Sequence, residues 1–363
     1  MYDFIPVKSY YDVFYYFILF VCIIAFFHTQ VLQPDEQKAK SFNSIGSWGL
    51  FILILTFIGF RPVSGVFIDM MTYAHIFKRY TYGAYVIDSD YGFSYFILFC
   101  TKTMTLESFF FICAIIYVVP LFVVSKKWFP NYHFYAFLLL VASMSFFAYG
   151  VNGIRNGMAT SLFIMALSYY KRNTMLMILF FIVSFSFHTS MLLPLTAFAL
   201  SYFVTDTKKY YFFWILSIIL SISMGGIWEN IFASIGFGDD RFATYLTADV
   251  DARRFASIGF RYDFLAYSAV PIILSFHYKF KKGYESMIYD RILHTYMITN
   301  GFWIMIIRAN YSNRFAYLSW FLMALVIIYP VLHKKIWDNQ YKKLGYLLIF
   351  YYAFTFLIYL KDA

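Results

Sequence analysis

The stretch that decides the fold is residues 150–190, GVNGIRNGMATSLFIMALSYYKRNTMLMILFFIVSFSFHTS. It contains two apolar runs that are separated by the basic pair Lys171 and Arg172. Both runs are shorter than the roughly 20 apolar residues of an ordinary membrane-spanning helix, so we expect tilted helices that pair as a hairpin. The stretch therefore predicts a membrane-embedded hairpin that carries Arg155 and His188 at the same end.

Apolar runs of this kind recur along the whole chain. The chain is 62% hydrophobic and only 13% charged, and repeated runs near spanning length are typical of a polytopic membrane protein. About twelve spans are expected, and they are Val13–Leu32, Ile45–Phe60, Ser108–Val124, Tyr132–Tyr149, Ile154–Tyr170, Thr174–Phe187, Met191–Val204, Tyr210–Met224, Asp263–Lys279, Ile292–Ile307, Phe315–Leu332 and Leu344–Leu360. We find no internal repeat and no low-complexity linker, so the sequence predicts an all-α protein with one domain over residues 1–363.

The short connectors between the spans set the orientation, because cytoplasmic connectors carry an excess of Lys and Arg. One set of connectors holds most of the lysines: Lys38, Lys40, Lys126, Lys127, Lys171, Arg172, Lys208, Lys209, Lys279, Lys281, Lys282, Arg291, Lys334, Lys335, Lys342 and Lys343. The opposite short connectors hold only Arg155, Arg308 and Arg314. We therefore expect the first set in the cytoplasm, with both termini and the long segments 61–107 and 225–262 outside.

The run from Tyr91 to Met104 is also apolar. A further span there would invert the topology of everything downstream and place the lysine connectors outside. We therefore expect a re-entrant or interfacial helix, with protein or a water-filled cavity around any irregular backbone at that depth.

Most of the arginines fall on the expected outer face, whereas the lysines gather on the cytoplasmic side. The outer arginines are Arg61, Arg79, Arg155, Arg241, Arg253, Arg254, Arg261, Arg308 and Arg314. Charges near the membrane are costly unless they are solvated or paired, so we expect this face to bind an anion. The net charge is +10, but basic patches in solvated loops are missing, so nucleic acid is a poor partner and lipid headgroups or lipid-linked phosphates fit better.

The strongest local signal is the glycine-rich turn of residues 150–157, which contains Asn152, Arg155 and Asn156 and opens the hairpin. Its glycines let the backbone approach a ligand closely, and the start of a helix directs free amides and a positive dipole end toward an anion. Arg155 adds a bidentate donor that suits phosphate. The alternative is a tight turn whose arginine reaches the headgroups.

His188 lies on the same side, at the outer turn of a tight helical hairpin, within Phe187-His-Thr-Ser190. A histidine can accept a proton from a sugar hydroxyl near neutral pH, so we predict that His188 is a catalytic base beside Arg155. The alternative is a histidine at a helix end that hydrogen-bonds a carbonyl group.

Further substrate-binding candidates lie at the outer ends of other spans. They are Arg61, Asp69, Tyr73, Arg261, Arg308 and Arg314. Asp69 could orient an arginine or hold a sugar hydroxyl, and a solvated face of an amphipathic helix would explain it equally well. Two arginines in one short outer connector, Arg308 and Arg314, are costly unless they are solvated or bind an anion.

Asp88 and Asp90 form an Asp-x-Asp pair on the expected outer face. Such a pair can hold a divalent ion on a diphosphate in metal-dependent glycosyltransferases, but two acids before an apolar helix are more often helix N-caps. The cysteines Cys22, Cys100 and Cys113 lack metal-ligand spacing. We therefore expect neither a metal nor another cofactor.

Taken in order, these motifs resemble EpsG-like proteins, which are Wzy-type polymerases of bacterial O-antigen, capsule and exopolysaccharide. The matching elements are Arg61 to Asp69 with Tyr73, Asp90-Tyr-Gly-Phe93, Ile154-Arg-Asn156 with Ala159, Phe187-His-Thr-Ser190, and Arg314 with Tyr317. The resemblance covers residues 50–330. It departs from the family where Asn156 stands in place of a frequent glutamine, and where Asp90-Tyr-Gly-Phe stands in place of Glu-Pro-Gly-Phe.

The resemblance implies a GT-C-like glycosyltransferase in the bacterial inner membrane with its active site facing the periplasm. A glycan on polyprenyl (undecaprenyl) diphosphate would be transferred to a lipid-linked repeat unit, and polyprenyl diphosphate would leave. Arg155, Arg314 and Arg61 would bind the diphosphate in place of a metal. His188 would be the base or a second diphosphate ligand, and a chain-length regulator is a candidate partner.

Three rival functions remain open. A flippase for lipid-linked oligosaccharide would also bind diphosphate, but it would need basic charge deeper in the membrane and usually internal repeats. A surface-glycan acyltransferase would place its histidine nearer the cytoplasm, because acyl-CoA is cytosolic. An O-antigen ligase differs from a polymerase mainly in its acceptor, which the sequence does not reveal.

Overall fold

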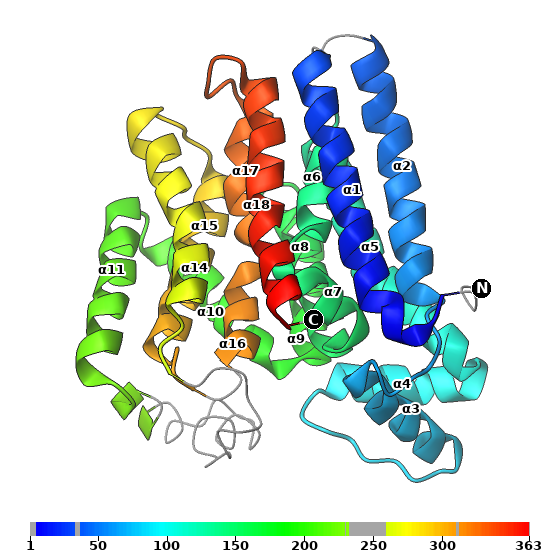
Figure 1. The fold of residues 1–363 in the computed structure, drawn as a ribbon. Helices are drawn as coiled ribbons and strands as arrows, with labels where there is room; N and C mark the ends of the chain where they lie inside the picture. Colours follow the sequence, from blue (N-terminus) through cyan, green and yellow to red (C-terminus); the bar gives the residue numbers. More distant parts are fainter. Residues whose placement is uncertain (1–4, 33–36, 229, 232–258, 310–311, 363) are drawn as a thin grey trace. The chain divides into compact units, whose positions relative to one another are not determined.

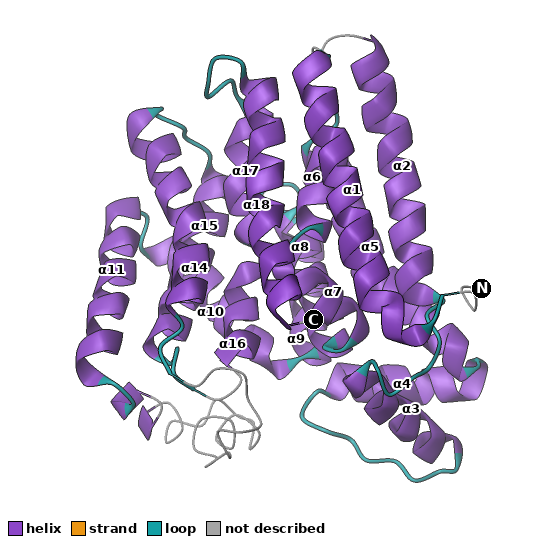
Figure 2. Cartoon of the chain, viewed as in Figure 1, coloured by secondary structure: helices purple, strands orange, loops and turns teal. Residues whose placement is uncertain are grey.

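The computed structural model describes residues 5–32, 37–228, 230–231, 259–309 and 312–362. Among these residues every regular element is a helix, and no strand is present (Figure 2). The all-α prediction is therefore confirmed. Arg241, Arg253 and Arg254 lie outside the described residues.

The chain divides into two compact units, Met1–His188 with Val331–Ala363, and Thr189–Pro330. The helices of the first unit are η1 (Val7–Ser9), α1 (Tyr10–Val31), α2 (Gln37–Gly59), α3 (Ile68–Thr81), α4 (Tyr91–Thr103), α5 (Leu106–Trp128), α6 (His133–Val141), α7 (Met144–Val151), α8 (Ile154–Leu167), α9 (Thr174–Phe187) and α18 (Gln340–Asp362). The second unit holds η2 (Thr189–Met191), α10 (Leu192–Phe203), α11 (Thr207–Met224), α14 (Tyr262–Phe276), η4 (His277–Lys281), α15 (Met287–Met305), α16 (Ser312–Trp320) and most of α17 (Met323–His333). That the whole chain acts as one domain stays a prediction.

Within the described residues, five helical stretches are long and apolar enough to cross a membrane. They are Val7–Val31, Gln37–Gly59, Leu106–Trp128, Ser312–His333 and Gln340–Lys361. The predicted span Tyr132–Tyr149 is instead two helices, α6 and α7, bent by 68° at the break between them, and it would make a sixth. The membrane character is thus confirmed, whereas the count of about twelve spans stays a prediction.

Helix α1 shows how the membrane-facing helices divide their surface. It buries a stripe at every fourth position, including Tyr10, Phe14 and Ile18, against α18 and its other neighbours. On the other side it leaves Phe20 and Phe27 60% exposed. Aromatic side chains on the outward surface fit a lipid environment, because in water a patch of this kind would favour association.

The predicted hairpin is present as α8 and α9, which pack along each other in the first unit. Ser184 of α9 donates its hydroxyl to the carbonyl of Ala159 at 2.6 Å, so the helices approach closely. Asn173 caps α9 by accepting the amide of Leu176 at 3.0 Å. Lys171 adopts a positive φ of 56° in the turn.

Helices α3 and α4 lie across the ends of α1, α2 and α5 rather than alongside them (Figure 1). The interfacial helix predicted at Tyr91–Met104 is confirmed as a helix, α4. Its buried side, with Phe93 and Ile97, packs on α3 and α9. Its other side leaves Tyr91, Tyr95 and Phe99 exposed by 61% or more, which is the tyrosine-rich surface expected at a membrane interface.

The second unit is organised around α15, which packs on α10, α11, α14 and α16. Its buried Asn300 accepts from the indole of Trp214 at 2.8 Å and donates to the hydroxyls of Ser268 at 3.1 Å and Ser319 at 3.0 Å. A buried amide with its hydrogen bonds made in this way stabilises one arrangement of the four helices.

Candidate active site

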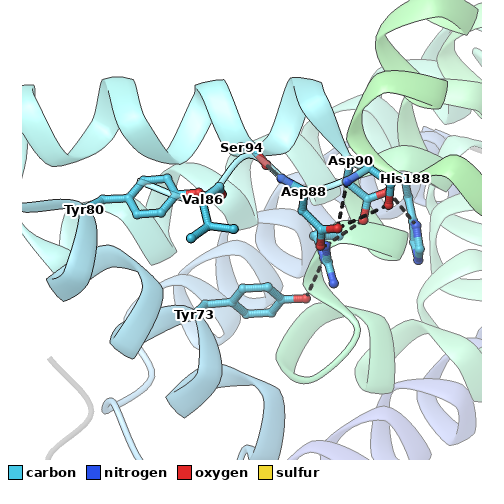
Figure 3. Close-up of polar contacts among 9 residues, drawn as sticks. Tyr73, Tyr80, Val86, Asp88, Asp90, Ser94 and His188 are labelled. Atoms are coloured by element: carbon cyan, nitrogen blue, oxygen red, sulfur yellow. Dashed lines mark hydrogen bonds and ion pairs between the residues drawn. The ribbon is translucent and has the colours of Figure 1, made fainter. Parts of the chain in front are cut away.

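Asp90 is the centre of the polar cluster in the first unit (Figure 3). Its side chain is fully buried, and its Oδ2 lies 2.6 Å from Nη1 of Arg155. The same guanidinium nitrogen lies 3.3 Å from Oδ2 of Asp88, a carboxylate that is 49% exposed. A buried carboxylate is costly unless it is paired, so Asp90 is the fixed partner of Arg155 and Asp88 is the solvated one.

His188 binds the other oxygen of Asp90. Its Nδ1 lies 3.3 Å from Oδ1 of that carboxylate, and its side chain is 14% exposed. Because an ionised carboxylate only accepts hydrogen bonds, the neutral tautomer of His188 that fits this contact has its proton on Nδ1 and its lone pair on Nε2. The contact fixes one ring nitrogen, and in this tautomer the other nitrogen can accept a proton.

Tyr73 is a third hydrogen-bond partner of Arg155, after Asp90 and Asp88. The Nε of Arg155 donates to the Tyr73 hydroxyl at 3.2 Å, and the guanidinium carbon lies 5.6 Å from the centre of the Phe93 ring. Burial raises the pKa of the Tyr73 hydroxyl, and the charge of Arg155 opposes that rise. The phenol is therefore neutral at physiological pH and accepts the arginine's hydrogen bond.

Gly92 allows the carboxylates to reach the hairpin. A Cβ at this position would lie 2.9 Å from the backbone carbon of Ser186 in α9, and it would overlap the Ser186 side chain. Only glycine lets α4 approach α9 this closely. Ser94, in the first turn of α4, accepts the amide of Asp88 through its hydroxyl at 3.2 Å and fixes the segment that carries both acids (Figure 3).

The glycine-rich turn allows close helix packing and also carries Arg155. A Cβ on Gly157 would lie 2.7 Å from the carbonyl oxygen of Tyr149, so this glycine lets α8 pack tightly on α7. Asn156 is half-buried beside Arg155 in the first turn of α8. Asn152 instead turns toward α1, where its amide donates to the Tyr11 hydroxyl at 3.0 Å.

Arg61 and Asp69 lie around the same Tyr11. Arg61 follows α2 and is only 5% exposed, and Asp69 is half-buried in the first turn of α3. Both charges interact electrostatically with the Tyr11 hydroxyl, and the charge of Asp69 also interacts with the Tyr73 hydroxyl. The first unit thus brings Arg155, His188 and Tyr73 together and gathers Arg61 and Asn152 into a neighbouring polar group.

The three remaining arginine candidates belong to the second unit. Arg261 forms an ion pair with Asp263 at 2.7 Å, and Arg308 donates to the carbonyl of Ser221 at 2.6 Å. Arg314 is exposed in the first turn of α16. Their assignment to the diphosphate stays a prediction.

Asp88 and Asp90 are the residues that sequence reasoning undervalued. Asp90 does occupy the N-cap position of α4, but its side chain makes no capping hydrogen bond and binds Arg155 and His188 instead. In the described part of the chain, no group of three or more His, Cys, Asp or Glu side chains is arranged to hold a metal ion. The signal that could have found them is charge balance, because Asp88 and Asp90 are close in sequence to the other motifs and can neutralise an outer arginine.

The fold and the site define a helical membrane protein with an arginine and a histidine held on one buried carboxylate at the end of a helical hairpin. The model of the EpsG family matches residues 48–363, and the chain belongs to the EpsG family. No curated protein and no solved structure matches it.

Proposed function

We propose that this protein is a polysaccharide polymerase, a glycosyltransferase that joins polyprenyl-diphosphate-linked repeat units on the outer face of the bacterial inner membrane. The observation that carries the proposal is the Arg155–Asp90–His188 arrangement, which sets a cation beside a proton acceptor in a partly buried site. Membership of the EpsG family supports the same class of reaction.

His188 is the base of the proposed reaction. Its Nε2 takes the proton from the acceptor hydroxyl, and the hydroxyl oxygen attacks the anomeric carbon of the donor glycan. The bond between that carbon and the diphosphate oxygen breaks, and polyprenyl diphosphate leaves with the electron pair. Asp90 fixes the imidazole and stabilises the imidazolium that forms, as a carboxylate does in other base–carboxylate pairs.

Arg155 stabilises the charge that develops on the leaving diphosphate. Its Nη1 is shared between Asp90 at 2.6 Å and Asp88 at 3.3 Å, so an incoming phosphate competes with the weaker and more exposed partner. We infer that Asp88 is displaced when the donor binds, and that Asp90 stays. Arg61 adds positive charge to the same substrate, without a metal ion.

The test is polymerisation by the purified protein in lipid nanodiscs with a polyprenyl-diphosphate-linked repeat unit. The parent protein should produce a ladder of glycans, and His188→Ala should lose it while still binding polyprenyl diphosphate. A ladder of normal length from His188→Ala would show that the base is another residue.

A deletion strain separates the rival functions. Single repeat units on the lipid, facing outward, indicate a polymerase. Polymer that stays on its lipid carrier indicates a ligase, and precursor trapped on the cytoplasmic side indicates a flippase.

A further inference from the structure

Arg61 is a buried cation with unused hydrogen-bond donors. It is 5% exposed, and Nη1 donates to the carbonyl of Ile58. Within the described residues, Nε and Nη2 are buried and have no hydrogen-bond partner. Burial lowers the pKa of the guanidinium to about 10, so it remains charged at neutral pH. A buried charge in this state is unfavourable until an anion pairs with it.

Two aromatic rings flank this guanidinium, and Asn152 lies on the nearby Tyr11. Its carbon lies 5.7 Å from the Phe67 ring centre and 5.4 Å from that of Phe110. Among the described residues, the buried Oδ1 of Asn152 also has no hydrogen-bond partner. Asn152 hydrogen-bonds the Tyr11 hydroxyl, and the charge of Arg61 interacts with the same hydroxyl. The residues around Tyr11 thus offer buried donors and a buried acceptor, as a phosphate with a protonated oxygen or a bound water would require.

An apolar cavity of about 160 Å³ lies between α1 and α2. It is lined by Ile5, Val13, Phe14, Phe17, Leu53, Ile54 and Phe57. Phe14 and Ile54 form a buried floor, whereas Val13 and Leu53 are 37% and 48% exposed at the rim. A cavity with a wholly apolar lining stays dry and accepts hydrocarbon, and this one opens on a surface of membrane-facing helices.

A row of packed aromatic rings lies between the cavity and the cation. Phe57, which lines the cavity, is one helical turn before Arg61. Its ring centre lies 4.9 Å from that of Tyr10, and Tyr10 lies 5.7 Å from Phe67, the ring beneath Arg61. A hydrocarbon-lined cavity and a cation without a carboxylate partner among the described residues therefore lie at the two ends of this row of rings.

We propose that the α1–α2 groove binds the isoprenoid tail of the lipid carrier and that Arg61 binds its phosphate. The inference rests on the proposed function, because it names the place where one lipid-linked substrate is held. Charge complementarity selects the occupant, since only a lipid with an anionic head satisfies the groove and the guanidinium together. None of Arg155, Asp90 and His188 lines the tail groove, so variants of these three residues should leave binding of the tail intact.

The experiment measures binding of a fluorescent polyprenyl phosphate to the full chain in nanodiscs, with photo-crosslinking to locate the tail. Leu53→Trp should fill the groove from its exposed rim and weaken binding by about tenfold or more. Ile52→Trp is the matched control, because Ile52 is the neighbouring residue in α2, is 53% exposed and does not line the cavity. It should bind like the parent protein.

Arg61→Gln should weaken polyprenyl phosphate by about tenfold or more, through loss of charge-assisted hydrogen bonds, but should not change binding of neutral polyprenol. Size-exclusion profiles and melting curves check that the variant folds, and Leu53→Trp tests the site independently of the buried arginine. Equal competition by phosphatidylglycerol would reduce the groove to a general phospholipid site. Displacement of the fluorescent lipid by inorganic phosphate alone would show that Arg61 is a general anion site. The phosphatidylglycerol result or the phosphate result would each overturn the proposal.

The two proposals fail in different ways. If Leu53→Trp and Arg61→Gln bind the lipid normally, the groove assignment is wrong and the polymerase proposal stands. If the parent protein binds the lipid in the groove but never produces polymer, the polymerase proposal is wrong. His188→Ala should still crosslink the lipid along α1 and α2, because its side chain contributes nothing to the groove.

Discussion

Asp90 joins His188 and Arg155 through its two oxygens, with Oδ1 3.3 Å from Nδ1 of the histidine and Oδ2 2.6 Å from Nη1 of the arginine. A single buried carboxylate thereby fixes the position of the proposed base relative to the proposed phosphate ligand. Any change in one contact alters the other, because Asp90 cannot turn toward the histidine without lengthening its bond to the arginine.

Asp90→Asn should reduce kcat by about 10²- to 10⁴-fold, which is the usual range for loss of a general base. An asparagine can present its amide to Nδ1 and favour the wrong tautomer of His188. The KM for the lipid-linked donor should change much less, and the melting temperature serves as the control for folding. A loss seen only in KM would contradict the role of Asp90 in positioning the base.

Asp88→Asn should have the opposite kind of effect. The ion pair of Asp88 with Arg155 is half-exposed, and such pairs contribute about 0–1 kcal/mol. Removing this competitor should lower the KM for the diphosphate-linked donor by at most about fivefold, with kcat little changed. Steady-state polymerisation rates give both values, and a large fall in kcat would show that Asp88 takes part in the reaction.

Arg155→Lys should abolish polymer although it keeps the positive charge. Lysine lacks the planar fork that reaches Asp90, Tyr73 and a phosphate together. Arg155→Ala should also abolish polymer and should lose diphosphate binding. It leaves Asp90 buried without its cation, which costs about 3–5 kcal/mol in comparable pairs, so its level in the membrane must be measured. Normal polymer from the lysine variant would rule out a bidentate clamp.

Polymerisation by the purified protein should survive EDTA. Both oxygens of Asp90 already bind Arg155 and His188, and in the proposed mechanism arginines supply the positive charge for the leaving group. The measurement is the glycan ladder before and after chelation. Activity that disappears and returns with magnesium or manganese would assign a metal-binding role to Asp88 and Asp90.

The orientation can be tested with single cysteines in intact cells. Ala84→Cys, in the exposed segment between α3 and α4, should react with an impermeant thiol reagent. Lys38→Cys and Lys335→Cys should be shielded, because the lysine-rich connectors are expected in the cytoplasm. The native cysteines are buried and should give little background. Labelling in the reverse pattern would place the candidate active site in the cytoplasm.

The apolar pattern predicted helices better than it predicted breaks within them. The run Val13–Leu32 corresponds to α1 with a shift of a few residues, and Tyr91–Met104 corresponds to α4. The run Tyr132–Tyr149 gave no sign of the 68° bend near Ser143, because the residues on both sides are equally apolar. A bend of this kind depends on what packs around it, and a single sequence does not contain that information.

The sequence predicted some residues of the candidate active site and missed the role of Asp90. Arg155, His188 and Tyr73 stood out because charged and polar groups are rare in such a chain. Asp90 did not, because an N-cap and an ion-pair partner look the same in sequence. Its partners are 65 and 98 residues away, and their meeting depends on the close approach of α4 to α9.

The shortness of α8 and α9 bears on the depth of the candidate active site in the membrane. Each has 14 residues, or roughly 21 Å at 1.5 Å per residue, against a hydrocarbon layer of about 30 Å. If their basic turn lies at the cytoplasmic headgroups, Arg155 and His188 lie about 9 Å below the outer edge of that layer. Depth-dependent quenching of a tryptophan placed at Asn156 would measure this. A site recessed to that depth would meet less water than one at the surface, and the proposed transfer to a sugar hydroxyl would be favoured over hydrolysis.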